Sequence, residues 1–110
     1  MADPTPGLGR GRREAVVAYA WGSPTVTISA EAQLERIRRH CFEQKWEIVA
    51  EIQARRFADL GELARRVVET EAQHLVLTRE AAEDLQQRLP ELWSELQTRF
   101  QARDVVLVVV

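Results

Sequence analysis

The sequence has little cysteine and no long hydrophobic segment, and each shortage excludes a class of protein. Its one cysteine, Cys41, rules out an intrachain disulfide and any metal site built from several cysteines. No segment reaches the roughly 18 consecutive apolar residues of a membrane helix, and no hydrophobic signal peptide opens the chain. We therefore expect a cytoplasmic protein with no membrane partner, in which Cys41 is a small core residue.

The sequence also lacks an excess of positive charge. It carries 15 basic and 17 acidic side chains, which gives a net charge of −2. Such a chain has no overall positive field to concentrate it on nucleic acid, so any contact with DNA has to be local. Lys45 is the single lysine, and all other basic residues are arginine, the better bidentate partner for phosphate. Charge alone predicts weak DNA binding at most.

The overall composition of the sequence is typical of one folded domain. The chain is 45% apolar and 29% charged, as in ordinary globular proteins, and its 110 residues suffice for one domain rather than two. Proline and glycine gather at the start, where Pro4, Pro6 and Gly7 belong to a segment without apolar periodicity. We expect residues 1–14 to form a flexible tail and residues 15–110 to form the domain.

Four short segments have strand patterns. The continuous apolar runs at residues 15–21, 74–77 and 105–110 are typical of strands that are buried on both faces of a parallel sheet. Residues 46–52 instead alternate apolar and polar side chains, which indicates a strand near an edge of the sheet. The all-aliphatic segment 105–110 is therefore predicted to be a fully buried fourth strand.

Amphipathic helices are predicted between these strands. Ser29 and Thr78 are placed to cap two of them by accepting hydrogen bonds from first-turn N–H groups. Pro90 interrupts a third helical pattern, which predicts either a kink or a new helix at that residue. Helical spacing also predicts that Asp84 faces solvent. Strands alternating with helices predict an α/β fold: a parallel four-stranded sheet in the order 2-1-3-4, with helices on both faces.

Three segments in order resemble a known family. Residues 19–23 read Tyr-Ala-Trp-Gly-Ser, residues 29–33 read Ser-Ala-Glu-Ala-Gln, and residues 46–49 read Trp-Glu-Ile-Val. Their order and spacing resemble the opening of the catalytic domain of serine site-specific recombinases, the resolvase and invertase family. The resemblance implies a resolvase-like three-layer fold. It also implies a serine nucleophile that attacks a DNA phosphodiester without a metal or nucleotide cofactor.

The resemblance assigns roles to particular residues. It places Ser23 at the nucleophile position, Gln33 at a glutamine near the scissile phosphate, and Tyr19 at a structural tyrosine of the first strand. Arg79, which follows the third predicted strand, matches one of the family's arginines, and Arg88 is a competing match. The resemblance thus implies a catalytic set of Ser23, Gln33 and Arg79.

The chain departs from the family pattern where positive charge is needed. The family has an arginine two residues before the nucleophile, and this chain has Trp21 there. The loop that follows the second strand is reduced to residues 54–58, without the family's serine, glycine and proline elements. Phosphoryl transfer needs fixed positive charge around the phosphate, and the loss of one such group typically lowers the rate by about 10²–10³. The sequence therefore indicates a degenerate active site.

Three functions remain open on the sequence alone. The favoured one is a degenerate recombinase-like domain that acts in association or regulation, as a homo-oligomer or with a protein partner. The second is an active DNA strand-exchange domain that uses Ser23, although no helix-turn-helix DNA reader follows in this sequence and specific DNA binding is expected to be weak. The third is an unrelated flavodoxin-like domain that binds a small ligand, which no Gly-rich phosphate loop supports.

Overall fold

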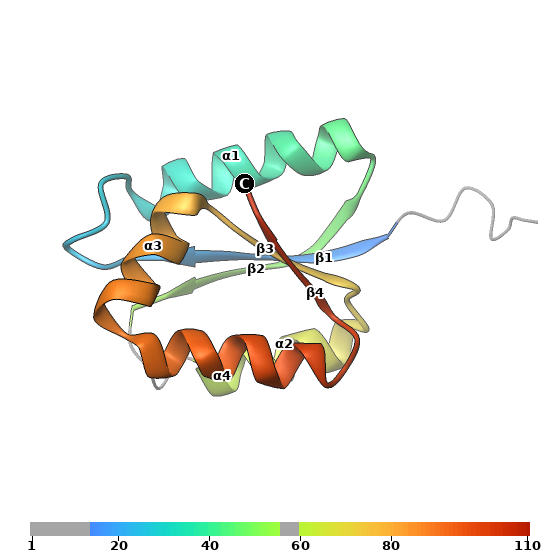
Figure 1. The fold of residues 1–110 in the computed structure, drawn as a ribbon. Helices are drawn as coiled ribbons and strands as arrows, with labels where there is room; N and C mark the ends of the chain where they lie inside the picture. The colour runs from blue at the N-terminus through green and yellow to red at the C-terminus, as the bar shows by residue number, and fades with distance from the viewer. Residues whose placement is uncertain (1–13, 56–59) are drawn as a thin grey trace, which may run out of the picture.

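Strands and helices alternate through the computed structural model, which describes residues 14–55 and 60–110 (Figure 1). The residues of the expected tail, apart from Glu14, lie outside these ranges. The elements are β1 (Ala15–Trp21), α1 (Ala30–Gln44), β2 (Glu47–Ala54), α2 (Leu60–Thr70), β3 (His74–Leu77), α3 (Arg79–Arg88), α4 (Pro90–Gln101) and β4 (Val106–Val109).

The strands form one parallel sheet in the order β2-β1-β3-β4, which confirms the predicted topology. Helix α1 covers one face of the sheet, and α2 and α4 cover the other, while α3 lies beyond the carboxyl ends of the strands (Figure 1). The predicted α/β class with helices on both faces is confirmed. None of the helices in the described residues is both long and apolar enough to cross a membrane.

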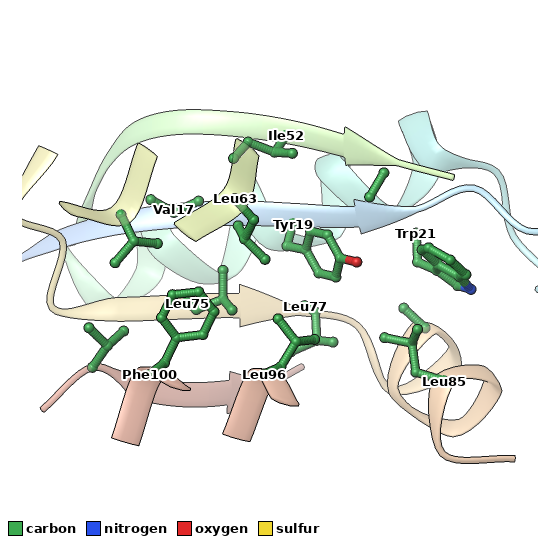
Figure 2. Packing of buried hydrophobic residues seen from close by; sticks show 14 of the residues in the cluster. Val17, Tyr19, Trp21, Ile52, Leu63, Leu75, Leu77, Leu85, Leu96 and Phe100 are labelled. Atoms are coloured by element: carbon green, nitrogen blue, oxygen red, sulfur yellow. The ribbon is translucent and has the colours of Figure 1, made fainter. Parts of the chain in front are cut away.

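The central strand β1 divides the hydrophobic core in two. Successive side chains of a strand point to opposite faces of the sheet. Val17, Tyr19 and Trp21 accordingly pack into the larger core with α2, α3 and α4, which Figure 2 shows from close by. Val16, Ala18 and Ala20 pack into the smaller core under α1, which also contains Cys41. Burial on both faces from Val16 to Trp21 explains why β1 is apolar along its length.

The predicted helix starts are confirmed. The Ser29 hydroxyl accepts a hydrogen bond from the Ala32 N–H at 3.1 Å at the start of α1. The Thr78 hydroxyl does the same for α3, with the Ala81 N–H at 3.3 Å. Pro90 is the first residue of α4, so it begins a separate helix rather than a kink.

The prediction that residues 105–110 form a fully buried strand is wrong. β4 is the last strand of the sheet, and its valines Val106 and Val109 are 53% and 44% exposed. The error has a physical cause: an aliphatic run reports β propensity, but not how much of the strand other elements cover. The predicted order 2-1-3-4 already placed this strand at an edge of the sheet, which is confirmed, and only its full burial was predicted wrongly.

Candidate functional site

Ser23 lies just beyond the carboxyl end of β1, the strand that has β2 on one side and β3 on the other. The pairing of β1 with β2 continues one residue past the strand, where the Gly22 N–H donates to the Ala54 carbonyl at 2.8 Å. The Ser23 side chain is half-buried and belongs to the first turn of the loop that leads to α1. In parallel α/β sheets this edge is where functional groups collect.

One guanidinium reaches the Ser23 hydroxyl. Nη1 of Arg88, the last residue of α3, donates to Ser23 Oγ at 2.6 Å and to Thr25 Oγ1 at 2.8 Å. The Thr25 N–H also donates to Ser23 Oγ at 3.3 Å, and the two hydroxyl oxygens are 3.0 Å apart. Ser23, Thr25 and Arg88 therefore form one hydrogen-bonded group, although Arg88 lies 65 positions after Ser23 in the chain.

A buried carboxylate lies directly beside this group. Asp84, one helical turn before Arg88, accepts hydrogen bonds from Trp21 Nε1 at 2.7 Å and from the Thr25 hydroxyl. Asp84 Oδ2 is also 3.6 Å from Arg88 Nη1. The prediction that Asp84 faces solvent is wrong, since the residue is only 8% exposed. Its burial is tolerated because the indole N–H and the hydroxyl satisfy the carboxylate.

The surroundings of Asp84 set its ionisation and the direction of the hydrogen bonds. Burial pushes the pKa of Asp84 upward, but hydrogen bonds from Thr25 and Trp21 and the charge of Arg88 outweigh it, so the pKa lies below its usual range. An ionised carboxylate only accepts, so Thr25 gives its single hydroxyl proton to Asp84. The Ser23 hydroxyl proton is then available to Thr25 or to Asp84 itself, because a hydrogen bond from Ser23 also lowers the pKa of Asp84. Hydrogen bonds thus link Ser23 and Thr25 to the same carboxylate.

Trp21 is part of the core rather than part of an open site. It is the last residue of β1, is 2% exposed, and belongs to the larger core cluster. Figure 2 shows its ring at the carboxyl end of β1, next to Leu85 of α3. An aromatic ring cannot bind phosphate through paired N–H donors as a guanidinium does. Trp21 gives its one polar group, the indole N–H, to Asp84.

Gln33 is fully buried and clamps the end of β1 to α1. Its Oε1 accepts from the Trp21 N–H at 2.8 Å, and its Nε2 donates to the Trp21 carbonyl at 2.8 Å and to the Ile28 carbonyl at 3.2 Å. The side-chain amide has two N–H donors, and both are used inside the protein. No donor of Gln33 is left for a phosphate in this arrangement.

Arg79 and Tyr19 occupy different surroundings. Arg79 is the exposed first residue of α3, and its backbone N–H donates to the Val110 carbonyl at 2.8 Å. The structure does not bring the Arg79 side chain into hydrogen-bond contact with Ser23; the arginine that makes this contact is Arg88. Tyr19 is buried in the larger core, as expected of a structural residue.

Sequence reasoning missed Thr25 and Asp84. The spacing of Asp84 and Arg88 at i and i+4 on one helix was the available signal, because such pairs are neighbours on a helix surface. No local pattern links Trp21 to Asp84, which lies 63 positions further along the chain. Only the packing of α3 over the end of β1 brings them together.

Comparison with known proteins finds a solved structure with a similar fold. No protein-family model matches the sequence, and no curated protein matches it. Among solved structures, the chain is similar to the C-terminal catalytic domain of ISC1926 TnpA, an IS607-like serine recombinase. The TM-score is 0.64 at 14% sequence identity, and the match covers 87% of this chain and 70% of that chain. The chain therefore has a serine-recombinase-like fold.

Proposed function

We propose that this chain is a serine-recombinase-like domain that has lost DNA strand transfer and acts through protein association. One observation carries the proposal: the guanidinium that contacts Ser23 lies 3.6 Å from the buried carboxylate of Asp84. Transfer of a phosphodiester needs fixed positive charge around the phosphate. Here the negative charge of Asp84 offsets the positive charge of Arg88 beside the serine, which weakens the attraction for an incoming phosphate.

The hydrogen bonds around Ser23 also argue against an activated nucleophile. A serine hydroxyl attacks only when a base or a strong electrostatic field assists it. Among the described residues, Asp84 is the carboxylate linked to the Ser23 and Thr25 hydroxyls, and its lowered pKa makes it a weak base. The hydrogen bonds and the Arg88 charge that lower this pKa keep Asp84 ionised and make it a poorer proton acceptor. Gln33 and Trp21 use their polar groups inside the protein, so of the described residues that the resemblance singles out, Arg88 is the one that contacts Ser23.

A second candidate is an active strand-transfer domain, and the 2.6 Å contact between Arg88 and Ser23 favours it. In that reading the Ser23 oxygen forms a bond to phosphorus, and the bond to the leaving deoxyribose oxygen breaks. The Ser23 proton passes to Thr25 as Thr25 gives its own to Asp84, and the leaving oxygen takes a proton from solvent. Arg88 holds a non-bridging oxygen of the phosphate.

Covalent capture of DNA separates the two candidates. The protein is incubated with supercoiled plasmid and with a pool of random-sequence duplexes, and denaturing gels are searched for protein attached to a DNA end. We expect no adduct from the unmodified chain or from Ser23→Ala. An adduct in the unmodified chain that disappears in Ser23→Ala would establish the second candidate.

A gain-of-function variant sharpens the test. Trp21→Arg combined with Asp84→Asn supplies a second guanidinium and removes the opposing carboxylate, while Ser23, Thr25 and Arg88 stay in place. An adduct that appears in this double variant and vanishes when Ser23→Ala is added supports the account of a degenerate site. Circular dichroism confirms that the double variant is folded before its result is scored.

A further inference from the structure

The outer edge of β4 presents unpaired backbone groups. Val106 and Val110 donate their N–H groups to Gln73 and Leu77 at 2.9 Å, so the backbone groups of these residues face β3. Consecutive residues of a strand turn their backbone groups to opposite sides, and Leu107 and Val109 therefore turn theirs away from the sheet. Within residues 14–55 and 60–110, no strand lies on that side of β4.

The side chains of this edge are apolar on both faces of the sheet. Val106 and Val109 are the exposed valines of β4, and residues 105–110 contain no charged or polar side chain. On the α4 side, Leu107 and Val109 also line a groove of about 490 Å³ together with Trp93 and Phe100. An exposed apolar edge of this kind is a template for pairing with another strand.

The opposite edge of the sheet is protected against such pairing. β2 carries Glu47 and Glu51, and Glu51 is held by Arg38 at 2.7 and 2.8 Å. Its pairing with β1 also shifts at Val49, so that Val16 lies opposite Ile48 and Val17 opposite Ala50. Edge charges and irregular pairing are the usual devices against edge-to-edge association, and β4 has neither.

The sequence of β4 is symmetric, which suits pairing with a second copy of the same strand. Residues 105–109 read Val-Val-Leu-Val-Val, which is the same in both directions. An antiparallel partner with the same sequence, related by a twofold axis at Leu107, places leucine opposite leucine and each valine opposite a valine. In this register the exposed Val109 lies against Val105 of the other copy, and the exposed Val106 lies against Val108. The register also turns the outward backbone groups of Leu107 and Val109 toward the partner strand.

We propose that a second copy of this chain docks on β4 as an antiparallel strand, with the twofold axis at Leu107, and joins the two sheets into one. This inference specifies the association role proposed above and rests on it. Its test is independent of DNA chemistry, because a dimer of this kind can form whether or not Ser23 reacts, and an inert Ser23 does not require a dimer.

Disulfide trapping tests the register directly. In the proposed dimer the two Leu107 Cα atoms are about 5.5 Å apart, within the range that a disulfide bridges. The two Val109 Cα atoms are separated by four residues along the strands, or about 13 Å. We expect Leu107→Cys to form a covalent dimer under mild oxidation at least about tenfold faster than the matched variant Val109→Cys. The unmodified chain is the blank, because its one cysteine, Cys41, is buried.

Sedimentation over a concentration series tests the surface without cysteine chemistry. We expect the unmodified chain to dimerise and Val109→Pro to stay monomeric, since proline removes an outward N–H that β3 does not use. Phe42→Lys, which changes an 83% exposed residue of α1, is the control and should dimerise as the unmodified chain does.

Two outcomes overturn the proposal. One is a strictly monomeric unmodified chain at high concentration, which would leave the edge to a different partner. The other is a dimer that Val109→Pro does not weaken, or in which Leu107→Cys and Val109→Cys cross-link at equal rates while both variants remain folded. A dimer that is trapped selectively through position 107 and lost in Val109→Pro supports it.

Discussion

Two clusters of hydrogen-bonded charges in this molecule each combine an arginine with carboxylate side chains, one in the interior and one at the surface. At the carboxyl ends of the strands, Asp84 is buried and accepts hydrogen bonds from the Trp21 indole N–H and the Thr25 hydroxyl. The Arg88 guanidinium lies beside it. On the outer surface of α1 and β2, the half-exposed Arg38 donates to Glu51, Glu35 and Glu31 at distances between 2.7 and 3.1 Å.

Both clusters shift the pKa values of their members. Arg38 lowers the pKa of Glu51 chiefly by its hydrogen bond, and the hydrogen bond to Glu51 is the largest cause of the raised pKa of Arg38. The pKa of Asp84 is lowered although burial alone would raise it. The number of hydrogen bonds and the direction of the shifts therefore do not distinguish the two clusters.

Depth does distinguish them. At the surface, water and salt replace a lost partner, so an exposed ion pair adds little net stability. In the interior, a polar group that loses its partner keeps the whole cost of its desolvation. We infer that the polar groups around Trp21 hold the end of β1 and α3 in place, whereas the Arg38 cluster contributes mainly to solubility and to protection of the β2 edge.

The largest effect is expected at Gln33, which holds the backbone of Trp21. Gln33→Met keeps the side-chain length but leaves the Trp21 N–H and two carbonyls without partners in the interior. We expect the free energy of unfolding to fall by about 3 kcal/mol, measured by urea denaturation. Gln44→Met, at an exposed position at the end of the same helix, is the control and should change it by less than about 0.5 kcal/mol. Equal effects of the two substitutions would contradict the comparison.

An intermediate and pH-dependent effect is expected at Asp84. Because its pKa is lower in the folded protein, the ionised carboxylate stabilises the fold above the pKa of the unfolded chain, and this contribution is lost as the pH falls through the folded-state value. Asp84→Asn should therefore lower the free energy of unfolding by about 1–2 kcal/mol at pH 7. The difference from the unmodified chain should shrink toward acid pH.

The control for Asp84 is Glu83→Gln, which removes a carboxylate from an exposed position of the same helix. Its effect should be smaller at pH 7 than that of Asp84→Asn. A destabilisation by Asp84→Asn that stays constant from neutral to acid pH would show that the carboxylate's charge plays no part. In that case the cluster would depend on shape and hydrogen bonds alone.

The sequence predicted the fold well because its signals are local. Alternating apolar runs and amphipathic segments define the order of elements, and Ser29 and Thr78 cap helices through residues three positions away. Given short right-handed connections, few parallel topologies remain for such an order. What failed was the predicted full burial of β4, since β propensity carries no information on how much of a strand other elements cover.

The candidate site was predicted only in part. The position of Ser23 followed from β1 and the loop after it, both of which are local features. The choice between Arg79 and Arg88 stayed open because both follow β3, and only the direction in which α3 leaves the sheet decides which guanidinium reaches Ser23. Helical spacing alone predicts that Asp84 faces solvent, because it carries no information on Trp21, which belongs to a strand distant in sequence.

The smallest effect is expected in the exposed cluster, where Arg38→Gln removes the guanidinium shared by Glu31, Glu35 and Glu51. At low salt, Arg38→Gln should lower the free energy of unfolding less than Gln33→Met or Asp84→Asn does, because water solvates the freed carboxylates. The destabilisation by Arg38→Gln should vanish near 1 M salt, where the screening length is about 3 Å. Arg39→Gln, at the next and exposed position, removes the same charge without an ion pair among the described residues and serves as the control. If Arg38→Gln destabilised the protein as much as Gln33→Met, and high salt did not reduce the effect, depth would not be what separates the two clusters.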